Sequence, residues 1–464
     1  MYSGSKGGFH LNIVQRKRNT VYLEQALLCG VRSSHLPVRE RLPERGSQSG
    51  TQTGQQREDD EETHQLEELA QLTRSAGAIV VDKVIQTIHR PTPNYYLGQG
   101  KVAEMADLIA EKDIDVVIFN NDLSPAQIRN LEQTLDTKVL DRTELILDIF
   151  ATHARTQTAK LQVELAQLEY ALPRLKGRWT HLAQIEGGIG QRGPGEKQIE
   201  LDRRLAHKRI IKLKAQIERI KERRAREVAS RQDNFNIALV GYTNAGKSTL
   251  MNRLTGAHQP VEDKLFSTLD TKINLWALSS HFGNNPQGKG GKVLLSDTVG
   301  FIRNLPHHLV ASFYATLEEA RQADLLLLVI DASSPEVLLQ VETVKATLSE
   351  LEINPAKAGL IFNKMDRADP MELTIMKKQF PEALFISALD GTGLDRLEEK
   401  VSGLLKESQE ELHLKIPVRE GKLLAFLSAH GQVLKKVYQD SVVNMVVRLS
   451  PRDAYQVKQI LKSR

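Results

Sequence analysis

The stretch Gly241-Tyr-Thr-Asn-Ala-Gly-Lys-Ser248 matches the pattern G-x-x-x-x-G-K-[ST] and decides the fold of the largest part of the chain. Apolar residues 235–240 predict a buried strand before it, and residues 249–255 predict a helix after it, ended by Gly256. This order presents consecutive backbone N–H groups to a polyphosphate. Lys247 is expected to reach the β and γ phosphates, and the Ser248 hydroxyl to bind Mg²⁺. The stretch alone indicates a phosphate-binding loop.

Two later stretches indicate which nucleotide this loop binds. A predicted strand over residues 292–296 leads into Asp297-Thr-Val-Gly300, where Asp297 is expected to hold Mg²⁺ through water and the Gly300 amide to contact the γ-phosphate. Another predicted strand ends in Asn363-Lys-Met-Asp366. The Asp366 carboxylate can accept hydrogen bonds from N1–H and the exocyclic amino group of guanine, a pairing that adenine cannot offer. The pattern therefore predicts a guanine nucleotide, GTP or GDP.

A last predicted strand, residues 384–389, runs into a loop whose Ser387 and Ala388 amides are expected to face the guanine O6. Together with apolar strands at 325–330 and 359–362, it completes the series of a Ras-like α/β GTPase domain, which we place at residues 233–408. The predicted reaction is the Mg²⁺-dependent hydrolysis of GTP to GDP and phosphate.

The composition of the whole chain sets wider limits. Of 464 residues, 40% are hydrophobic and 26% are charged, as in an ordinary soluble protein, and the length suggests about three domains. A single cysteine, Cys29, excludes an intrachain disulfide and a cysteine-based zinc site. No apolar run is long enough to span a bilayer. We therefore expect a cytoplasmic protein without a membrane span, with partial membrane association left open, and a monomer.

The first 62 residues divide into two segments. Residues 1–38 hold a predicted first strand, residues 25–31, and residues 1–23 before it contain basic residues and no acid. An organelle-targeting peptide fits that composition, but the absence of an amphipathic period disfavours it. Residues 39–62 are rich in Gly, Ser, Thr, Gln and charge, and we expect them to be a disordered insertion.

Residues 63–152 alternate between helical and strand patterns. Leu66, Leu69, Ala70 and Leu72 form a helical stripe, and strands are expected at 78–84, 115–119 and 138–140. Ser124 and Pro125 have the types preferred at a helix N-cap and first turn. This alternation predicts a small parallel α/β domain ahead of the GTPase domain.

Residues 153–232 predict a long antiparallel helical arm. Helices at 159–172 and 196–231 carry apolar seams, with Leu161, Leu165, Leu168 and Leu172 in the first and Ile210, Leu213, Ile217 and Ile220 in the second. The outer faces of the second helix are strongly basic. A charge run is often only a solvated face, but within residues 203–226 eleven cations against Glu218 and Glu222 favour a phosphate-backbone partner. The basic residues are Arg203, Arg204, Lys208, Arg209, Lys212, Lys214, Arg219, Lys221, Arg223, Arg224 and Arg226.

Between these helices lies Glu186-Gly-Gly-Ile-Gly-Gln-Arg-Gly-Pro-Gly195. So many glycines cannot pack a core, so the stretch is either a flexible turn or a loop that enters a narrow, negatively charged cavity. In the second case, which the basic flanks favour, Arg192 and Trp179 would contact RNA by charge and stacking. After the GTPase domain, residues 409–464 predict a small α+β domain, with strands at 412–417 and 441–449 and helices at 422–435 and 451–462.

Beyond the GTPase motifs, residues 64–408 resemble the HflX family of translational GTPases, within the wider Obg-HflX-like group. The resemblance rests on four stretches, Leu123-Ser-Pro-Ala-Gln127, Asp141-Arg-Thr-Glu-Leu-Ile-Leu-Asp-Ile-Phe150, Lys160-Leu-Gln-Val-Glu-Leu-Ala-Gln-Leu168 and Gly187-Gly-Ile-Gly-Gln-Arg-Gly-Pro-Gly-Glu196. It implies a protein that binds the large ribosomal subunit and its rRNA and separates the subunits of stalled or idle ribosomes, with hydrolysis timing its release.

The resemblance also implies a first switch at Phe266-Ser-Thr-Leu-Asp270, where Thr268 would ligate Mg²⁺ and sense the γ-phosphate. The family has a proline after that aspartate, whereas this chain has Thr271, which therefore competes for the role. The implied catalytic residues are Lys247, Thr268, Gly300 and Asn244, and the metal ligands are Ser248, Thr268 and, through water, Asp297. The full set of expected GTP contacts is Gly241, Tyr242, Thr243, Asn244, Ala245, Gly246, Lys247, Ser248, Phe266, Ser267, Thr268, Leu269, Asp270, Asp297, Thr298, Val299, Gly300, Asn363, Lys364, Met365, Asp366, Ser387, Ala388 and Leu389. The expected RNA contacts are Arg192, Arg203, Arg204, Lys208, Arg209 and Lys212.

The residue after Gly300 bears on the rate. Ras-type enzymes have a glutamine there that orients the attacking water, whereas this chain has Phe301, which forms no side-chain hydrogen bond. We therefore expect slow intrinsic hydrolysis that the ribosome stimulates. Similar GTPases with an asparagine at the position of Asn244 bind K⁺, so Asn244 either helps to hold K⁺ or is simply structural. Two other functions stay open: a checkpoint GTPase in large-subunit assembly, and a GTP-dependent signalling switch without RNA contact.

Overall fold

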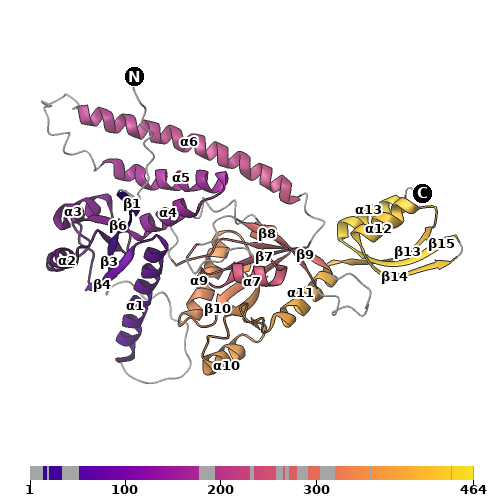
Figure 1. Cartoon of the computed structure of the whole chain (residues 1–464). Coiled ribbons are helices and arrows are strands. Elements are labelled where there is room, and N and C mark those ends of the chain that lie inside the picture. The colour runs from indigo at the N-terminus through magenta and orange to yellow at the C-terminus, as the bar shows by residue number, and fades with distance from the viewer. Residues whose placement is uncertain are drawn as a thin grey trace. The chain divides into compact units, whose positions relative to one another are not determined.

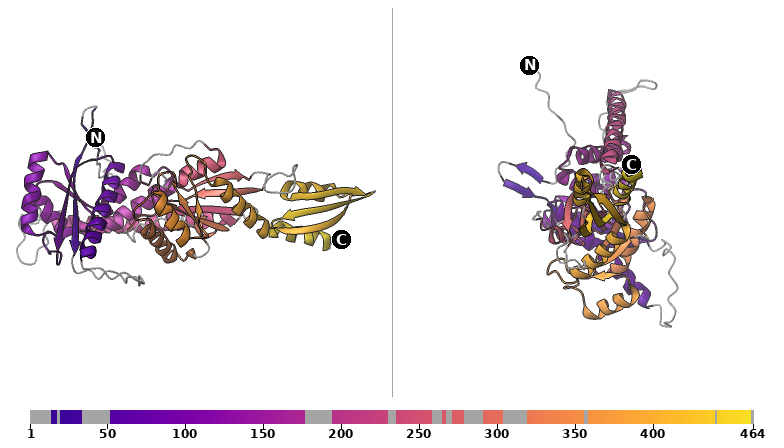
Figure 2. Two further views of the ribbon diagram at one scale, coloured as in Figure 1. Left: turned by 90° about the horizontal axis from the view of Figure 1, so that it is seen from below. Right: turned by 90° about the vertical axis from the view of Figure 1, so that its right-hand side faces the viewer.

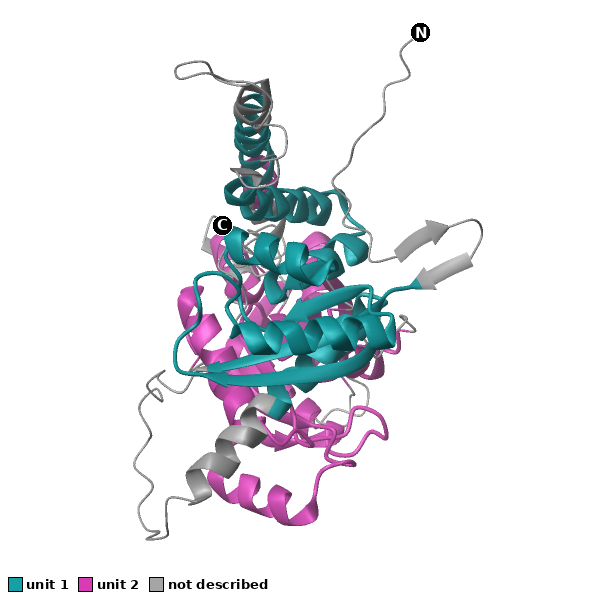
Figure 3. Ribbon diagram, turned by 90° about the vertical axis from the view of Figure 1, so that its left-hand side faces the viewer, with its two compact units in different colours: residues 1–217, 305–312 teal, residues 218–304, 313–464 magenta. Residues whose placement is uncertain are grey.

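The computed structural model describes residues 14–17, 20–33, 52–176, 194–229, 235–257, 265–266, 271–278, 291–303, 319–355, 358–439 and 441–462. The chain forms two compact units, residues 1–217 with 305–312 and residues 218–304 with 313–464 (Figure 3). No helix in the described part of the chain has both the length and the apolar character that crossing a bilayer requires.

The first unit contains a parallel four-stranded sheet in the order β4-β3-β5-β6, as the alternating pattern predicts (Figure 1). Its core includes Leu27, Phe119 and Leu131, which are fully buried. Ser124 caps α3 as predicted, because its hydroxyl accepts from the Gln127 amide while the Gln127 side chain accepts from the Ser124 amide. The elements are β1 (Val14–Lys17) and β2 (Thr20–Leu23), which pair with each other, β3 (Gln25–Ser33), α1 (Gln52–Ser75), β4 (Ile79–Ile88), α2 (Gln99–Lys112), β5 (Val116–Phe119), α3 (Pro125–Leu135), β6 (Lys138–Asp141) and α4 (Arg142–His153).

The expected disordered insertion at residues 39–62 is wrong in its second half. Helix α1 begins at Gln52 and continues through the buried stripe Leu66, Leu69, Ala70 and Leu72. Its first turns are rich in Gln and Glu, which have good helix propensity, and they extend a helix that the apolar stripe already stabilises. Residues 39–51 lie outside the described ranges.

The helical arm consists of α5 (Gln157–Ala171), the short 3₁₀ helix η1 (Leu172–Lys176) and α6 (Pro194–Ala229). Helices α5 and α6 lie side by side in Figure 1. Their predicted apolar seam is confirmed, since Leu165, Ile210, Leu213 and Ile217 are buried together with Leu161, Leu168 and Leu172 packed around them. The glycine-rich stretch, residues 186–195, lies in or beside the undescribed residues 177–193.

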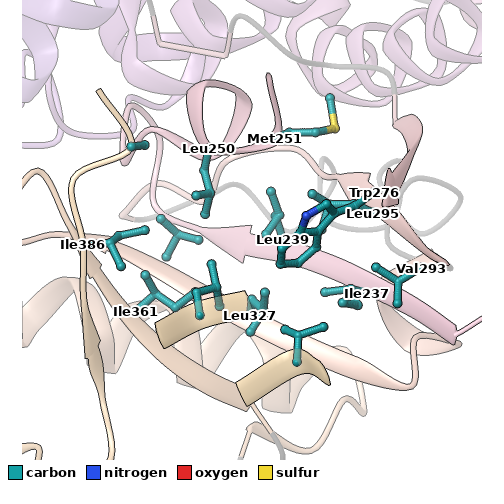
Figure 4. Packing of buried hydrophobic residues seen from close by; sticks show 14 of the residues in the cluster. Ile237, Leu239, Leu250, Met251, Trp276, Val293, Leu295, Leu327, Ile361 and Ile386 are labelled. Carbon is teal, nitrogen blue, oxygen red and sulfur yellow. The ribbon is translucent and has the colours of Figure 1, made fainter. Parts of the chain in front are cut away.

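The second unit contains a six-stranded sheet in the order β12-β11-β10-β7-β9-β8, with β8 antiparallel to β9 and the other pairs parallel. Buried side chains such as Leu239, Leu250, Trp276 and Ile386 fill its core (Figure 4). This is the Ras-like α/β arrangement that the motifs predict. Its elements are β7 (Phe235–Gly241), α7 (Lys247–Thr255), β8 (Lys272–Ala277), β9 (Lys292–Asp297), β10 (Leu325–Asp331), α9 (Val337–Glu350), β11 (Ala358–Asn363), α10 (Pro370–Gln379), β12 (Leu384–Phe385) and α11 (Leu394–Ser408).

The C-terminal residues form a three-stranded antiparallel sheet, β13-β15-β14, with two helices packed on one face (Figure 2). The predicted helix at 422–435 is wrong beyond His430, because α12 ends there and residues 432–439 form β14 instead. A Cβ on Gly431 would lie 2.4 Å from Val447 Cγ2, so the chain turns closely over β15 at this point. The elements are β13 (Glu410–Pro417), α12 (Gly421–His430), β14 (Gln432–Gln439), β15 (Val442–Leu449) and α13 (Pro451–Lys462).

A candidate nucleotide site and a basic helical face

The phosphate-binding loop joins the end of β7 to the start of α7. Gly246 has φ 88°, and a Cβ there would lie 2.3 Å from Asn363 Nδ2, so both the backbone conformation and the space require glycine. Asn244 also has a positive φ, 58°, which asparagine tolerates better than most residues. The turn therefore brings the helix N-terminus and its free N–H groups to the edge of the sheet, where an anionic phosphate can bind.

Lys247 is the buried cation of this loop. Its Nζ donates to the carbonyl oxygens of Tyr242 at 2.8 Å and Gly241 at 3.2 Å. Burial lowers the pKa of Lys247 to about 8; the nearby charge of Asp297 opposes this shift, and that of Lys364 adds to it. An anionic phosphate beside this ammonium would favour its charged form, so the loop is suited to bind a polyphosphate.

Two of the residues expected to bind Mg²⁺, Ser248 and Asp297, lie together. Ser248 Oγ donates to Asp297 Oδ2 at 2.6 Å, while Asp297 Oδ1 is buried without a hydrogen-bond partner in the described part of the chain. Burial raises the pKa of Asp297, and the charge of Lys247 opposes the shift. A hydroxyl and a buried carboxylate with unused acceptor capacity are hard oxygen donors, which fit Mg²⁺ or its water ligands.

Gly300 lies directly against the phosphate-binding loop. A Cβ on Gly300 would lie 2.8 Å from Thr243 Cα and 3.1 Å from Lys247 Nζ, so only glycine allows this approach. The next residue, Phe301, is buried and its backbone pairs with the loop, since its amide donates to Gly241 O at 3.0 Å and its carbonyl accepts from the Thr243 amide at 2.7 Å. This backbone pairing has no signal in the sequence and was not predicted.

The Asn363 side chain joins two loops of the site. Its Nδ2 donates to Ala245 O and its Oδ1 accepts from the Ala388 amide, both at 2.9 Å. Lys364 Nζ lies 2.7 Å from Asp331 Oδ2, a partner that the sequence analysis missed. Asp331 ends β10 and is in register with Asn363 at the end of the neighbouring β11, so its place at a strand end was the available signal. The side chain of Asp366 remains partly exposed.

The two amides expected to face the guanine O6 have acceptors within the protein. The Ser387 amide donates to Thr392 O at 3.0 Å, and the Ala388 amide donates to Asn363 Oδ1 at 2.9 Å. A buried amide requires an acceptor, which the turn at 387–392 supplies for Ser387 and the Asn363 side chain supplies for Ala388. Leu389, by contrast, is 67% exposed. A contact between this loop and the base stays a prediction.

The first switch is only partly described. Phe266 is buried with φ 58°, and Thr271 lies just before β8, whereas Ser267, Thr268, Leu269 and Asp270 lie outside the described residues. The competition between Thr268 and Thr271 for the γ-phosphate therefore stays open.

The outer face of α6 presents the predicted cations. Arg203, Arg204, Lys208 and Lys212 are exposed, while Arg192 lies outside the described residues. Arg209 also lies on α6, and its Nε and Nη2 donate to the two carboxylate oxygens of Glu164 at 2.6 and 2.7 Å, so an RNA contact of this residue stays a prediction. Its guanidinium, at the edge of the seam, therefore joins α6 to α5. The sequence alone does not reveal this, since the two residues are 45 positions apart.

Comparison with protein families assigns three parts of the chain. Residues 63–151 match the model for the N-terminal region of GTP-binding GTPases, and residues 153–231 match the model for their middle region. Residues 236–364 match the model described as a 50S ribosome-binding GTPase.

Curated relatives match most of the chain. The GTPase HflX of Lacrimispora saccharolytica is 46% identical over 81% of this chain and 87% of its own length. The GTPase HflX of Escherichia coli is 40% identical over 84% of this chain and 91% of its own length. Among solved structures, a GTP-binding protein from Sulfolobus solfataricus in complex with GDP is 26% identical and aligns with a TM-score of 0.42, covering 83% of this chain and 99% of that one.

Proposed function

This chain belongs to the HflX family of GTPases, and on that premise we propose that it binds the large ribosomal subunit and dissociates stalled or idle ribosomes into subunits. The observation that carries the proposal is the set of exposed cations on α6, Arg203, Lys208 and Lys212, together with a complete phosphate-binding loop in the same chain. Several exposed cations on one helix suit the phosphate backbone of rRNA. The matched family description, a 50S ribosome-binding GTPase, agrees with this partner.

GTP hydrolysis would time the release of the protein from the subunit. The Gly300 amide would sense the γ-phosphate, which is supported by the close approach of Gly300 to Lys247, and ordering of this segment by GTP would stabilise the ribosome-bound state. Mg²⁺, when bound by Ser248 and through water by Asp297, would neutralise charge on the β and γ phosphates. The site of action would be the cytoplasm, and the active form a monomer.

Intrinsic hydrolysis would be slow, because the buried Phe301 has no polar side-chain group that could orient the attacking water. Binding to the ribosome would then order the switch segments. K⁺ bound beside Asn244 would be a second source of positive charge. The left-handed backbone of Asn244 agrees equally with a purely structural role for this residue. Measuring the GTP hydrolysis rate in K⁺ and in Na⁺ distinguishes K⁺ binding from a structural role of Asn244. An unchanged rate would leave only the structural role.

Sedimentation of whole ribosomes tests the splitting function. The protein with a non-hydrolysable GTP analogue is compared with a variant that lacks residues 187–195. We expect the whole-ribosome peak to disappear with the intact protein and to persist with the variant. Intact ribosomes together with co-sedimentation on free large subunits would support an assembly checkpoint instead. Absence of any ribosomal contact would leave the signalling switch.

A further inference from the structure

Asp141 is a fully buried carboxylate at the junction of β6 and α4. Its Oδ1 accepts from the Glu144 amide at 2.9 Å, which caps the first turn of α4, and its Oδ2 accepts from the Leu123 amide at 3.3 Å. Asp141 begins the stretch 141–150, and Leu123 begins the stretch 123–127. Both stretches support the family resemblance, yet neither contributes a residue to the nucleotide site.

Two further donors reach the same carboxylate from the helical arm. The Tyr170 hydroxyl, near the end of α5, donates to Asp141 Oδ1, and Arg174 Nη2, in η1, donates to Asp141 Oδ2 at 3.0 Å. One buried carboxylate therefore receives four donors, two from the parallel-sheet part of the unit and two from the arm.

The Arg174 guanidinium is fixed on several sides. Its Cζ lies 3.4 Å from the centroid of the Tyr170 ring, Nη1 donates to Tyr170 O at 3.1 Å, and Nη2 also donates to Leu123 O at 3.2 Å. A planar guanidinium can stack on an aromatic ring and donate in several directions at once, whereas a lysine ammonium cannot do both. Arginine and tyrosine are thus both specified by this arrangement.

The arm has an apolar interface between α5 and α6 and a polar interface around Asp141, and the two have different physical effects. The apolar seam between α5 and α6 stabilises the pair, but apolar packing is not directional. The contacts around Asp141 are directional, and a buried ion pair typically gains little stability over apolar packing because of its desolvation cost. Geometry, rather than added stability, is what such a cluster supplies.

We propose that Asp141, Tyr170 and Arg174 form a seat that fixes the end of α5 and η1 against the parallel sheet and so orients the arm toward the large ribosomal subunit. This inference rests on the proposed function. The three are positioning residues, since none of them needs to contact RNA or GTP. The seat gives a role to the stretches 123–127 and 141–150, which the GTPase chemistry leaves unused.

The test compares conservative variants of the seat with matched controls elsewhere in the unit. The seat variants are Asp141→Asn, Tyr170→Phe and Arg174→Lys. The controls are Tyr95→Phe, whose hydroxyl accepts from Thr134 Oγ1 at 3.4 Å in an exposed contact, and Arg155→Lys, which is exposed. Arm orientation is read as a spin-label distance between Gln133→Cys on α3 and Leu205→Cys on α6, both exposed positions of the first unit. The native Cys29 is buried and does not compete for label.

We expect the seat variants to broaden the distance distribution, while the controls keep the narrow distribution of the parent. Affinity for isolated large subunits should fall about tenfold for Arg174→Lys and Asp141→Asn, the loss of roughly one charge-assisted hydrogen bond, and less for Tyr170→Phe. Hydrolysis of GTP without ribosomes should stay at the parent rate.

An unchanged distance distribution in all seat variants would overturn the seat itself. A broadened distribution with unchanged subunit affinity would overturn its orienting role. If Asp141→Asn fails to fold, Tyr170→Phe and Arg174→Lys still decide between these outcomes. If the parent protein does not bind large subunits, the proposed function fails, and the distance measurement still reports on the seat alone.

Discussion

The nucleotide site and the basic face of α6 are both suited to bind phosphate, but by opposite physical means. The site relies on one buried ammonium, Lys247, held by carbonyl oxygens within a backbone that requires glycine. The face of α6 spreads its charge over exposed side chains such as Arg203, Lys208 and Lys212. Because water and salt screen exposed charges and hardly screen buried ones, one residue is decisive in the first region and many residues share the effect in the second.

The largest effect is expected at the buried ammonium. Lys247→Ala should weaken GTP binding by roughly 100-fold or more, because it removes a desolvated charge from the phosphate contact. Titration with a fluorescent GTP analogue measures the loss, and Lys378→Ala, an exposed position on α10, serves as the control. Equal GTP affinities of the parent and Lys247→Ala would show that no single buried charge is decisive at the nucleotide site.

The inner face of α6 comes next. Leu213 is fully buried in the seam, so Leu213→Ala should destabilise the pairing of α5 and α6 by about 3 kcal/mol. Ile211→Ala, at a position 68% exposed on the same helix, should cost less than about 0.5 kcal/mol. Amide hydrogen exchange of the two helices measures the difference. Similar exchange in both variants would argue against the seam as the source of arm stability.

The outer face of α6 should respond in proportion to the number of charges removed. The triple variant Arg203→Gln, Lys208→Gln and Lys212→Gln should bind large subunits about tenfold more weakly at low salt and lower the salt slope by roughly 2 to 3. The matched control removes three exposed cations from the second unit, at Lys345, Lys378 and Arg396. An unchanged salt slope in the α6 variant would contradict the RNA contact.

The smallest effect is expected in the pH dependence of GTP binding, through the protonation of the Lys247 amine. Its folded-state pKa of about 8 lies below the usual 10.5, so bound phosphates, which favour the ammonium, should cause proton uptake above pH 8. GTP affinity should therefore fall a few-fold between about pH 8 and 9.5, whereas the ligand-free protein should gain stability as pH rises from about 8 toward 10.5. Calorimetry at pH 9 in two buffers of different ionisation enthalpy counts the protons, and pH 7 is the control. No uptake at pH 9 would show that the ammonium is charged throughout.

Prediction from sequence succeeded where the signal was local. The strand, loop and helix around Gly246, the cap at Ser124 and the seam at Leu213 follow from neighbouring residues, and the structure confirms them. It failed where the local sequence is compatible with both a helix and a strand. Residues 432–439 have apolar positions that suit either a helix or a strand, and pairing with β15 decided for the strand.

The sequence by itself determined the Ras-like fold of the GTPase domain, the predicted choice of guanine and the basic character of the arm, because short motifs and helical periodicity depend on adjacent residues. Only the tertiary structure decided which polar groups satisfy one another. It pairs Lys364 with Asp331, Arg209 with Glu164, and Arg174 with Asp141. The physical reason is that a buried or half-buried polar group takes the nearest partner in space, and that partner lies 33 or more positions away in these three cases.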